Sequence, residues 1–298
     1  MALVDIPIII QISEEEKRIF EKFIKAQRSK HIRSSQEIVN EIFNNRPDLQ
    51  KYIIENQSVS NMIESLRTEV WEEFLKDEVN FNAAVMKDLY KVLDTPKLML
   101  DVLLEKNIVN KSGEELRESV KELCGEYAGR VFPYLYALSL SNTNSRRARA
   151  GKTFEAIIYK IYDLLGYKFD SQNRVGRKIF SDVGLGKKVD SVLPGINEFN
   201  KRRNKTIIGT MKTSLRERWQ EVAEEIERTK IPEIHLLTVD EDISVSKAAE
   251  MGNHNIVIVA YSWIADSDKL KHAKNIVSFE EYFFEEIPGI IEYWKKND

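Results

Sequence analysis

The chain has 298 residues, of which 42% are hydrophobic and 31% charged, and its formal net charge is −3. A chain of this length buries a full core and has room for two domains. No stretch approaches the roughly 20 apolar residues that span a bilayer, and no signal peptide is apparent, so we expect a cytoplasmic protein. The single Cys124 argues against disulfides, and the four scattered histidines show no zinc-ligand spacing.

The net charge conceals an uneven distribution of basic residues. Residues 141–220 contain 18 Lys and Arg against 7 Asp and Glu, which leaves 27 against 41 in the rest of the chain. A basic region in an acidic chain is typical of a surface that follows a phosphate backbone, although a solvated surface is the alternative. A nucleic acid is therefore an expected partner. The backbone-contacting residues that we expect are Arg146, Arg147, Arg149 and Lys152.

The first part of the sequence predicts a mainly helical domain over residues 1–140. Ser13 precedes three glutamates in a helix-capping pattern, and the apolar residues that follow recur on one helical face. Further helix starts are indicated at Ser35, near Pro47 and at Ser112. The polar stretch Ser141–Ser145 is expected to form a hinge into a second domain over residues 141–298.

The second domain is expected to be of the α/β class. Its predicted elements, in chain order, are a helix over Lys152–Leu165, strands over Tyr167–Ile179, Lys188–Leu193 and Lys205–Lys212, a helix over Leu215–Arg228, a strand over Glu233–Val239, a short helix over Val245–Met251 and a strand over Ile256–Ala260. This order predicts a mixed central sheet flanked by helices, with a ligand site at the strand ends.

Asp190 and Lys212 fall on consecutive predicted strands, where they bring a carboxylate and an ammonium to one edge. A carboxylate is the kind of ligand that Mg²⁺ prefers, and Mg²⁺ also binds substrate phosphate. We expect Asp190 to anchor the metal and Lys212 to position the attacking water and offset developing charge in phosphodiester cleavage. Because Asp and Lys are common at strand ends, a surface salt bridge is the alternative.

The helix that follows Lys212 offers a second carboxylate. Rotation by about 100° per residue puts Glu225 at the edge of the buried face and Glu224 nearly opposite the core. Glu221 neighbours Glu225 but lies farther round toward solvent. Glu225 is therefore the better candidate for a second metal ligand, against the alternative of an exposed glutamate on a charged helix.

Together these residues resemble the permuted PD-(D/E)XK active site of the type II restriction endonucleases related to EcoRII, PspGI and NgoMIV. In the common form of that superfamily the residue two before the lysine is acidic, whereas here it is Thr210, and this branch takes the missing carboxylate from the next helix, the place of Glu225. The family's acidic residue on the helix preceding the sheet is similar to Glu155. Val189 replaces the proline of the motif name. The resemblance covers residues 140–298 and implies an αβββαβ nuclease core.

The triplet Arg216, Glu217 and Arg218 carries the second half of the resemblance. This branch reads a CC and GG core through an Arg-(Asp/Glu)-Arg triplet at this helix start. The residue types suit the task, because arginine forks match guanine O6 and N7 and a carboxylate accepts from cytosine N4. The alternative is an ordinary charge mixture on a solvated helix.

The resemblance implies a Mg²⁺-dependent type II restriction endonuclease. It is expected to act as a homodimer, with the option of a higher oligomer, that cuts both strands of a palindrome with a CCGG or CC-N-GG core. The N-terminal helical domain, which is expected to support dimerisation or add DNA contacts, is similar to that of BsaWI and favours uninterrupted CCGG.

Two other functions remain open on the sequence. One is a structure-specific repair nuclease of the same superfamily. The other is a non-catalytic DNA-binding regulator, since an extended Ile6–Ile12 followed by two helices faintly resembles a ribbon-helix-helix protein.

Overall fold

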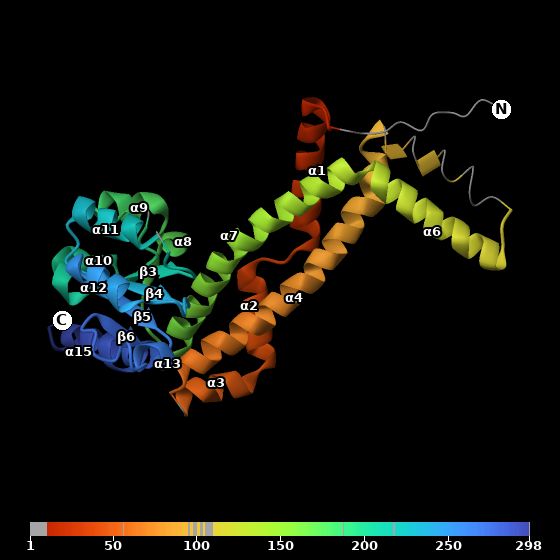
Figure 1. Cartoon of the computed structure of the whole chain (residues 1–298). Coiled ribbons are helices and arrows are strands. Elements are labelled where there is room, and N and C mark those ends of the chain that lie inside the picture. The colour runs from red at the N-terminus through yellow and green to blue at the C-terminus, as the bar shows by residue number, and fades with distance from the viewer. Residues whose placement is uncertain are drawn as a thin grey trace. The chain divides into compact units, whose positions relative to one another are not determined.

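The computed structural model describes residues 11–55, 57–94, 96–97, 100–101, 104, 110–186, 188–216 and 218–297 (Figure 1). The chain forms two compact units. The helical unit comprises Met1–Ser34 and Glu72–Ala148, and the sheet unit comprises Ser35–Trp71 and Arg149–Asp298. These units do not coincide with a division at residue 140, because the segment 35–71 packs with the sheet.

The helical unit is built around an apolar core between its longest helices. It contains α1 (Glu14–His31), the later part of α4 (Val59–Asp88), a 3-10 turn (Leu89–Lys91), α6 (Gly113–Arg130) and the first part of α7 (Phe132–Leu164). The predicted cap is present, since Ser13 and Glu16 form a reciprocal capping box at the start of α1. The core residues include Phe20, Phe81 and Tyr134.

The expected hinge at Ser141–Ser145 is wrong, because these residues lie inside α7. The side chains of Ser141 and Asn142 have partners within the helical unit. The Arg28 guanidinium donates hydrogen bonds to Ser141 Oγ at 3.1 Å and to Asn142 Oδ1 at 2.9 Å. Asn142 is buried and donates in turn to Asn82 Oδ1 at 2.8 Å. Satisfied in this way, the polar residues do not interrupt the helix.

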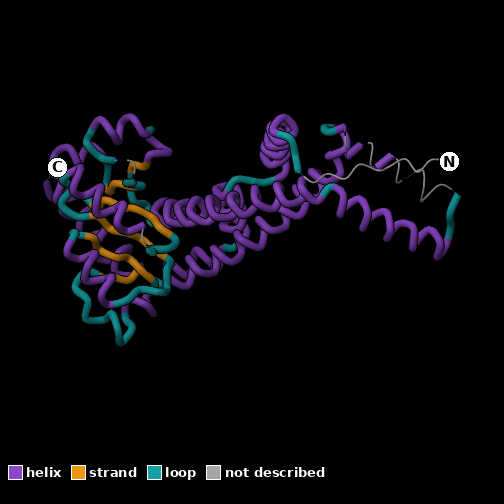
Figure 2. The backbone as a smooth tube through the Cα atoms, turned by 45° about the horizontal axis from the view of Figure 1, so that its top comes forward, coloured by secondary structure: helices purple, strands orange, loops and turns teal. Residues whose placement is uncertain are grey.

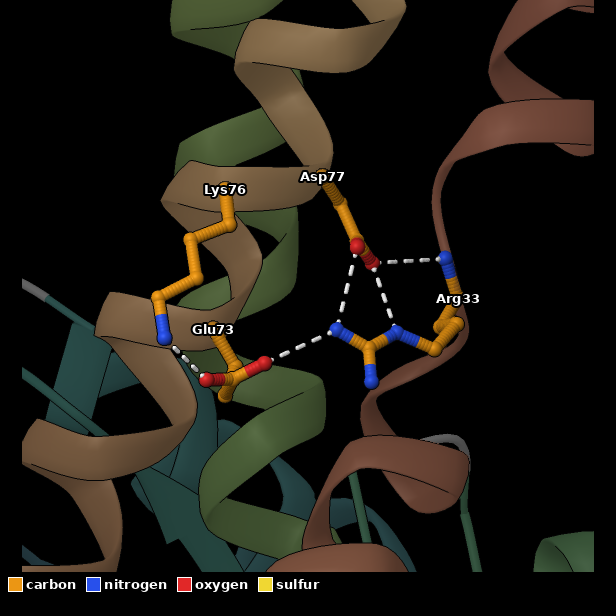
Figure 3. A network of polar contacts seen from close by, with 4 residues as sticks. All are labelled: Arg33, Glu73, Lys76 and Asp77. Carbon is orange, nitrogen blue, oxygen red and sulfur yellow. Dashed lines mark hydrogen bonds and ion pairs between the residues drawn. The ribbon is translucent and has the colours of Figure 1, made fainter.

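A charged network joins the segment after α1 to α4 (Figure 3). The buried carboxylate of Asp77 accepts from the backbone N of Arg33 and from its guanidinium Nε, both at 3.1 Å. Arg33 also contacts Glu73 at 3.1 Å, and Glu73 pairs with Lys76 at 2.5 Å. Charge-assisted hydrogen bonds of this kind are stronger than neutral ones, so they fix where the chain leaves α1.

The sheet unit is organised on a mixed sheet of six strands among the described residues, in the order β1-β2-β3-β4-β5-β6 (Figure 2). The strands are β1 (Asp170–Ser171), β2 (Ser191–Leu193), β3 (Ile207–Lys212), β4 (Ile234–Thr238), β5 (Ile256–Ala260) and β6 (Ile276–Ser278). The first two pairings are antiparallel, and the three from β3 to β6 are parallel. The parallel pairings align the carboxyl ends of β3 and β4, with Lys212 opposite Thr238.

Helices surround the sheet. They are α2 (Ser35–Asn45), α3 (Pro47–Ile54), the first part of α4, the later part of α7, α8 (Gln172–Val175), α9 (Arg177–Asp182), α10 (Ile196–Lys201), a 3-10 turn (Arg203–Lys205), α11 (Arg218–Thr229), α12 (Val245–Asn253), α13 (Ser262–Ala265), α14 (Phe279–Glu281), a π-helical turn (Tyr282–Glu286) and α15 (Ile287–Asn297). Apolar residues of α11 and α12, among them Val222 and Met251, share one core with Leu236 and Ile258 of the sheet. Elsewhere His235 of β4 packs against the ring of Tyr282.

The predicted strand over Tyr167–Ile179 is wrong. Only Asp170 and Ser171 pair with β2, and the short helices α8 and α9 follow. Gly176 separates the two helices with a φ of 91°, a value that favours glycine. The remaining predicted strands and helices of this domain are present with shifted ends. The elements α10, α13, β6, α14 and α15 were not predicted. Within the described ranges, none of the helices combines the length and apolar character needed to cross a membrane.

Candidate active site

Asp190 and Lys212 meet around the hydroxyl of Thr210. Asp190 immediately precedes β2, and its backbone N donates to Gly209 O of β3 at 2.8 Å. Its Oδ2 accepts from Met211 N at 2.7 Å and lies 3.4 Å from Thr210 Oγ1. Lys212 Nζ donates to the same hydroxyl at 3.3 Å. Thr210, which stands where the common form of the motif has an acidic residue, therefore connects the Asp190 carboxylate to the Lys212 ammonium.

Glu155 belongs to the same electrostatic environment. It lies on α7, and its pKa is raised to about 7 by burial first and then by the negative charge of Asp190, against the opposing effect of Lys212. Burial likewise raises the pKa of Asp190, while Lys212 lowers it. One turn after Glu155, Tyr159 donates its hydroxyl to the backbone O of Asp190 at 2.9 Å. Tyr159 was not among the predicted site residues, although its i+4 spacing from Glu155 places it on the same face of the helix.

The donor set of Asp190 and Glu155 fits a hard divalent cation. Burial raises the cost of ionising both carboxyl groups, and the charge of Asp190 raises it further for Glu155; a cation bound by both would offset that cost. In the part of the chain that the structure describes, no three His, Cys, Asp or Glu side chains are gathered as a metal site. A third carboxylate would therefore have to move before it joined them.

The structure places Glu225 apart from this pair. Its carboxylate is buried, and Oε1 accepts from the guanidinium of Arg228 at 2.7 Å. The carboxylate occupies space that only a glycine leaves open, because a Cβ on Gly186 would lie 1.1 Å from Glu225 Oε1. Among the described residues, no hydrogen bond or ion pair joins Glu225 to Asp190 or Lys212.

Glu221 faces the lysines instead. Its Oε2 pairs with Lys188 Nζ at 2.5 Å, and this bond is the main cause that lowers the pKa of Glu221, with smaller effects of Lys212 and Arg218. Helix rotation alone had directed Glu221 toward solvent. In the structure Glu221 is exposed, in agreement with that direction, and its partner Lys188 stands two residues before Asp190.

The expected recognition triplet straddles the start of α11. The helix begins at Arg218, not at Leu215, so Arg216 lies in the preceding loop. Both arginines are exposed, and Arg216 adopts a φ of 22°. Glu217 lies outside the described residues. The later start has a physical reason: the side chain of Leu215 is completely buried, which holds the chain against the core before it turns into the helix.

The expected backbone-contacting residues lie on α7 in different surroundings. In the helical unit, Arg146 is paired with the buried carboxylate of Glu78, which gives it a structural partner, and Arg147 is exposed. In the sheet unit, Lys152 is exposed and Arg149 is partly buried.

A cavity of about 620 Å³ opens beside Glu225 in the sheet unit. Its lining combines four basic side chains, those of Arg177, Lys178, Lys188 and Arg228, with the carboxylates of Glu225 and Asp182. An excess of positive charge in a concave site favours an anion such as phosphate. A larger cavity of about 860 Å³ lies between α1 and α7 of the helical unit and is lined by none of the candidate site residues.

The raised pKa of Glu155 predicts a pH-dependent cost to stability. The unfolded carboxyl has a pKa of about 4.3, and in the folded chain the value is about 7. The folded state therefore binds the extra proton, and stability falls as pH rises between these values. Glu155→Gln should remove this fall and should be more stable than wild type by on the order of 3 to 4 kcal/mol above pH 7, at about 1.4 kcal/mol per pKa unit. Urea unfolding of both proteins in the presence of a chelator, from pH 4 to 9, measures the free energy of unfolding. Parallel pH profiles of this free energy for the two proteins would contradict the prediction.

Comparison with known proteins relates this geometry to a family. A family model described as EcoRII C terminal matches residues 116–283, more than half of the chain. The type II restriction enzyme SsoII of Shigella sonnei is 32% identical over 231 residues, which cover 77% of this chain and 68% of that protein.

Solved structures agree with the family match. Metal-depleted Ecl18kI in complex with uncleaved, modified DNA is similar with a TM-score of 0.71 and 27% identity, covering 95% of this chain and 86% of that one. The complex of the restriction endonuclease PspGI with substrate DNA, at 18% identity, has a TM-score of 0.54 and covers 89% and 94%. The expected PD-(D/E)XK nuclease fold is confirmed. The chain belongs to the EcoRII C-terminal family of type II restriction endonucleases and is an enzyme that cleaves DNA.

Proposed function

We propose that this endonuclease is Mg²⁺-dependent and cleaves double-stranded DNA at a palindrome with a CCGG or CC-N-GG core. The observation that carries the proposal is that the candidate catalytic residues and the candidate base-reading residues are close in sequence. Thr210 and Lys212, which form a cluster with Asp190, lie at the end of β3, and two exposed arginines follow within six residues of Lys212. A loop that joins the cutting residues to base-reading residues is suited to site-specific cleavage.

In this proposal Asp190 and Glu155 would hold the cation, and Glu225 would complete the ligand set if it exchanged Arg228 for the metal. When bound, Mg²⁺ would supply Lewis-acid polarisation of the phosphate. Lys212 positions the attacking water and offsets the negative charge that develops on the phosphate. Thr210 orients the Lys212 ammonium through its hydroxyl, and the Met211 amide orients the Asp190 carboxylate. Support for a divalent metal also comes from the similar Ecl18kI structure, which is described as metal-depleted with uncleaved DNA.

We assign base reading to Arg216, Glu217 and Arg218. The two arginines are exposed and unshielded at the start of α11, where their guanidinium forks would reach guanine O6 and N7 in the major groove. Glu217 between them would accept from cytosine N4. The similar solved structures are DNA complexes, which supports double-stranded DNA as the partner.

We further propose a homodimer, because a two-fold dimer presents one active site to each strand of a palindrome. The N-terminal helical domain would support the dimer or contact flanking DNA. Arg147 of the helical unit and Arg149 and Lys152 of the sheet unit would contact the DNA backbone. Arg146 is a weaker candidate for that contact, since Glu78 engages its guanidinium. An enzyme that acts on DNA entering a cell would work in the cytoplasm.

Digestion of a plasmid of known sequence tests the proposal. The enzyme is incubated with Mg²⁺, with Ca²⁺ and with chelator, and the fragment ends are mapped. We expect discrete fragments that end at one CCGG or CC-N-GG palindrome, with Mg²⁺ only. Fragments whose ends share no sequence would instead support a structure-specific repair nuclease.

Arg216→Ala should weaken binding to the mapped site while leaving binding to unrelated DNA nearly unchanged. A bidentate arginine–guanine contact is worth roughly 1 to 3 kcal/mol, or about 5- to 150-fold in affinity. Fluorescence anisotropy in Ca²⁺ with site and scrambled duplexes measures the two affinities. Lys201→Ala, which removes a basic side chain outside the loop, is the control. An equal loss of affinity for both duplexes would show that Arg216 contacts the DNA phosphate backbone and does not read bases.

A further inference from the structure

We propose that Asp240 is a positioning residue for sequence recognition. From the segment that follows β4, it holds residues 213–216, here called the base-reading loop, in place. The inference rests on the proposed role of Arg216 and Arg218. Asp240 lies two residues after the end of β4 and 25 residues beyond Leu215 in sequence. Its Oδ2 accepts the backbone N–H of Leu215 at 2.7 Å. This bond fixes the residue immediately before Arg216.

The position of Asp240 is set by the sheet. Because β3 and β4 are parallel with Lys212 opposite Thr238, the segments that leave the two strands run side by side. The buried hydroxyl of Thr238 accepts the backbone N–H of Asp240 at 3.1 Å. The other carboxylate oxygen of Asp240 accepts from Asp242 N at 3.1 Å. The acceptor is therefore anchored on both sides before it reaches the loop.

Leu215 is the fixed point of the loop. Its side chain lies in the core shared with α11, and its carbonyl accepts from Arg218 N at 2.8 Å as the helix begins. With the Asp240 bond added, the side chain, amide and carbonyl of Leu215 are all held. Arg216, with its φ of 22°, departs from this point in a conformation that a non-glycine residue rarely adopts. Because Leu215 is fixed, it can maintain this conformation of Arg216 in the free protein, before DNA binds.

Preorganisation of this kind acts on specific binding alone. A loop that is already ordered loses less entropy when its arginines engage bases, whereas contacts to the DNA backbone tolerate a mobile loop. The negative charge of Asp240 acts differently from the ordering of the loop. A carboxylate repels DNA phosphates whatever the base sequence, so this charge weakens binding to specific and unrelated DNA alike. Removal of Asp240 should therefore weaken binding to the mapped site while slightly strengthening binding to unrelated DNA.

The experiment compares Asp240→Ala, Asp240→Asn and Asp242→Ala with wild type. Asn keeps one oxygen acceptor for Leu215, and Asp242→Ala removes the same charge from a neighbouring exposed position without touching that bond. Affinities for the site and scrambled duplexes are measured in Ca²⁺, and amide exchange is measured on a peptide that spans the loop. Melting temperatures confirm that each variant is folded.

We expect Asp240→Ala to lower the ratio of specific to non-specific affinity by about tenfold or more, the equivalent of one lost charge-assisted hydrogen bond. Loop amide exchange should accelerate in the same variant. Asp240→Asn should lose less, and Asp242→Ala should keep the ratio. The single-turnover cleavage rate at saturating enzyme should change less than the ratio does.

Two outcomes overturn the inference and differ from each other. If wild type prefers its site and Asp240→Ala keeps that preference, or loses affinity equally on both duplexes, Asp240 has no positioning role and the proposed base reading stands. If wild type binds site and scrambled duplexes equally, the base-reading assignment itself fails, and this inference fails with it.

Discussion

Asp190→Ala and Lys212→Ala should each reduce the rate of DNA cleavage by about a thousandfold or more, while binding to the site remains. Asp190 supplies the carboxylate that is fixed by Met211 N and Thr210, and Lys212 supplies the ammonium on the same hydroxyl. Neither side chain belongs to the base-reading loop. Single-turnover cleavage in Mg²⁺ and anisotropy in Ca²⁺ separate the chemical step from binding.

A matched control separates loss of chemistry from loss of charge. Lys188→Ala removes a lysine two residues from Asp190 whose pairing with Glu221 lies at the half-exposed surface, so it should cost far less activity. Thr210→Ser keeps the hydroxyl that connects the two groups, whereas Thr210→Val removes it at similar size. Undiminished cleavage by Asp190→Ala would refute the proposed metal site, and loss of binding together with cleavage would point to misfolding.

Glu225→Gln should reduce cleavage by at least about a hundredfold and raise the Mg²⁺ concentration that cleavage requires, whereas Glu221→Gln should have a small effect. The two residues lie one turn apart on α11. Glu225 is buried over Gly186 and paired with Arg228, while Glu221 pairs with Lys188 at the surface. A buried carboxylate with one exposed partner is the one that a cation can recruit by displacing Arg228.

The comparison of Glu225→Gln with Glu221→Gln tests which of the two glutamates is the metal ligand. Mg²⁺ titrations of cleavage are run on each variant, and Mg²⁺ binding is followed by calorimetry without DNA. Arg228→Ala provides the complementary change: it frees the Glu225 carboxylate and should strengthen metal binding, since displacement of the guanidinium no longer opposes it. If Glu221→Gln shows the large effect and Glu225→Gln the small one, the second carboxylate of the site is Glu221.

Much of the fold could be predicted because its signals are local. The amphipathic pattern of α11 and the apolar runs of β4 and β5 depend on each segment and the core that it faces. Errors arose where distant partners decide the structure. Ser141–Ser145 has the composition of a loop, but Arg28 and Asn82 satisfy its polar groups and α7 continues through it.

The sequence by itself determined the chemistry-bearing residue types, since the spacing of Asp190, Lys212 and Glu225 can be read directly along the chain. Only the tertiary structure decided where those side chains lie. In the folded chain Glu225 is hydrogen-bonded to Arg228 in the space that Gly186 leaves open, and Asp240 accepts a hydrogen bond from the backbone N of Leu215. The reason is physical: spacing along a helix or strand fixes the direction of a side chain, whereas its hydrogen-bond partner depends on segments that folding brings beside it.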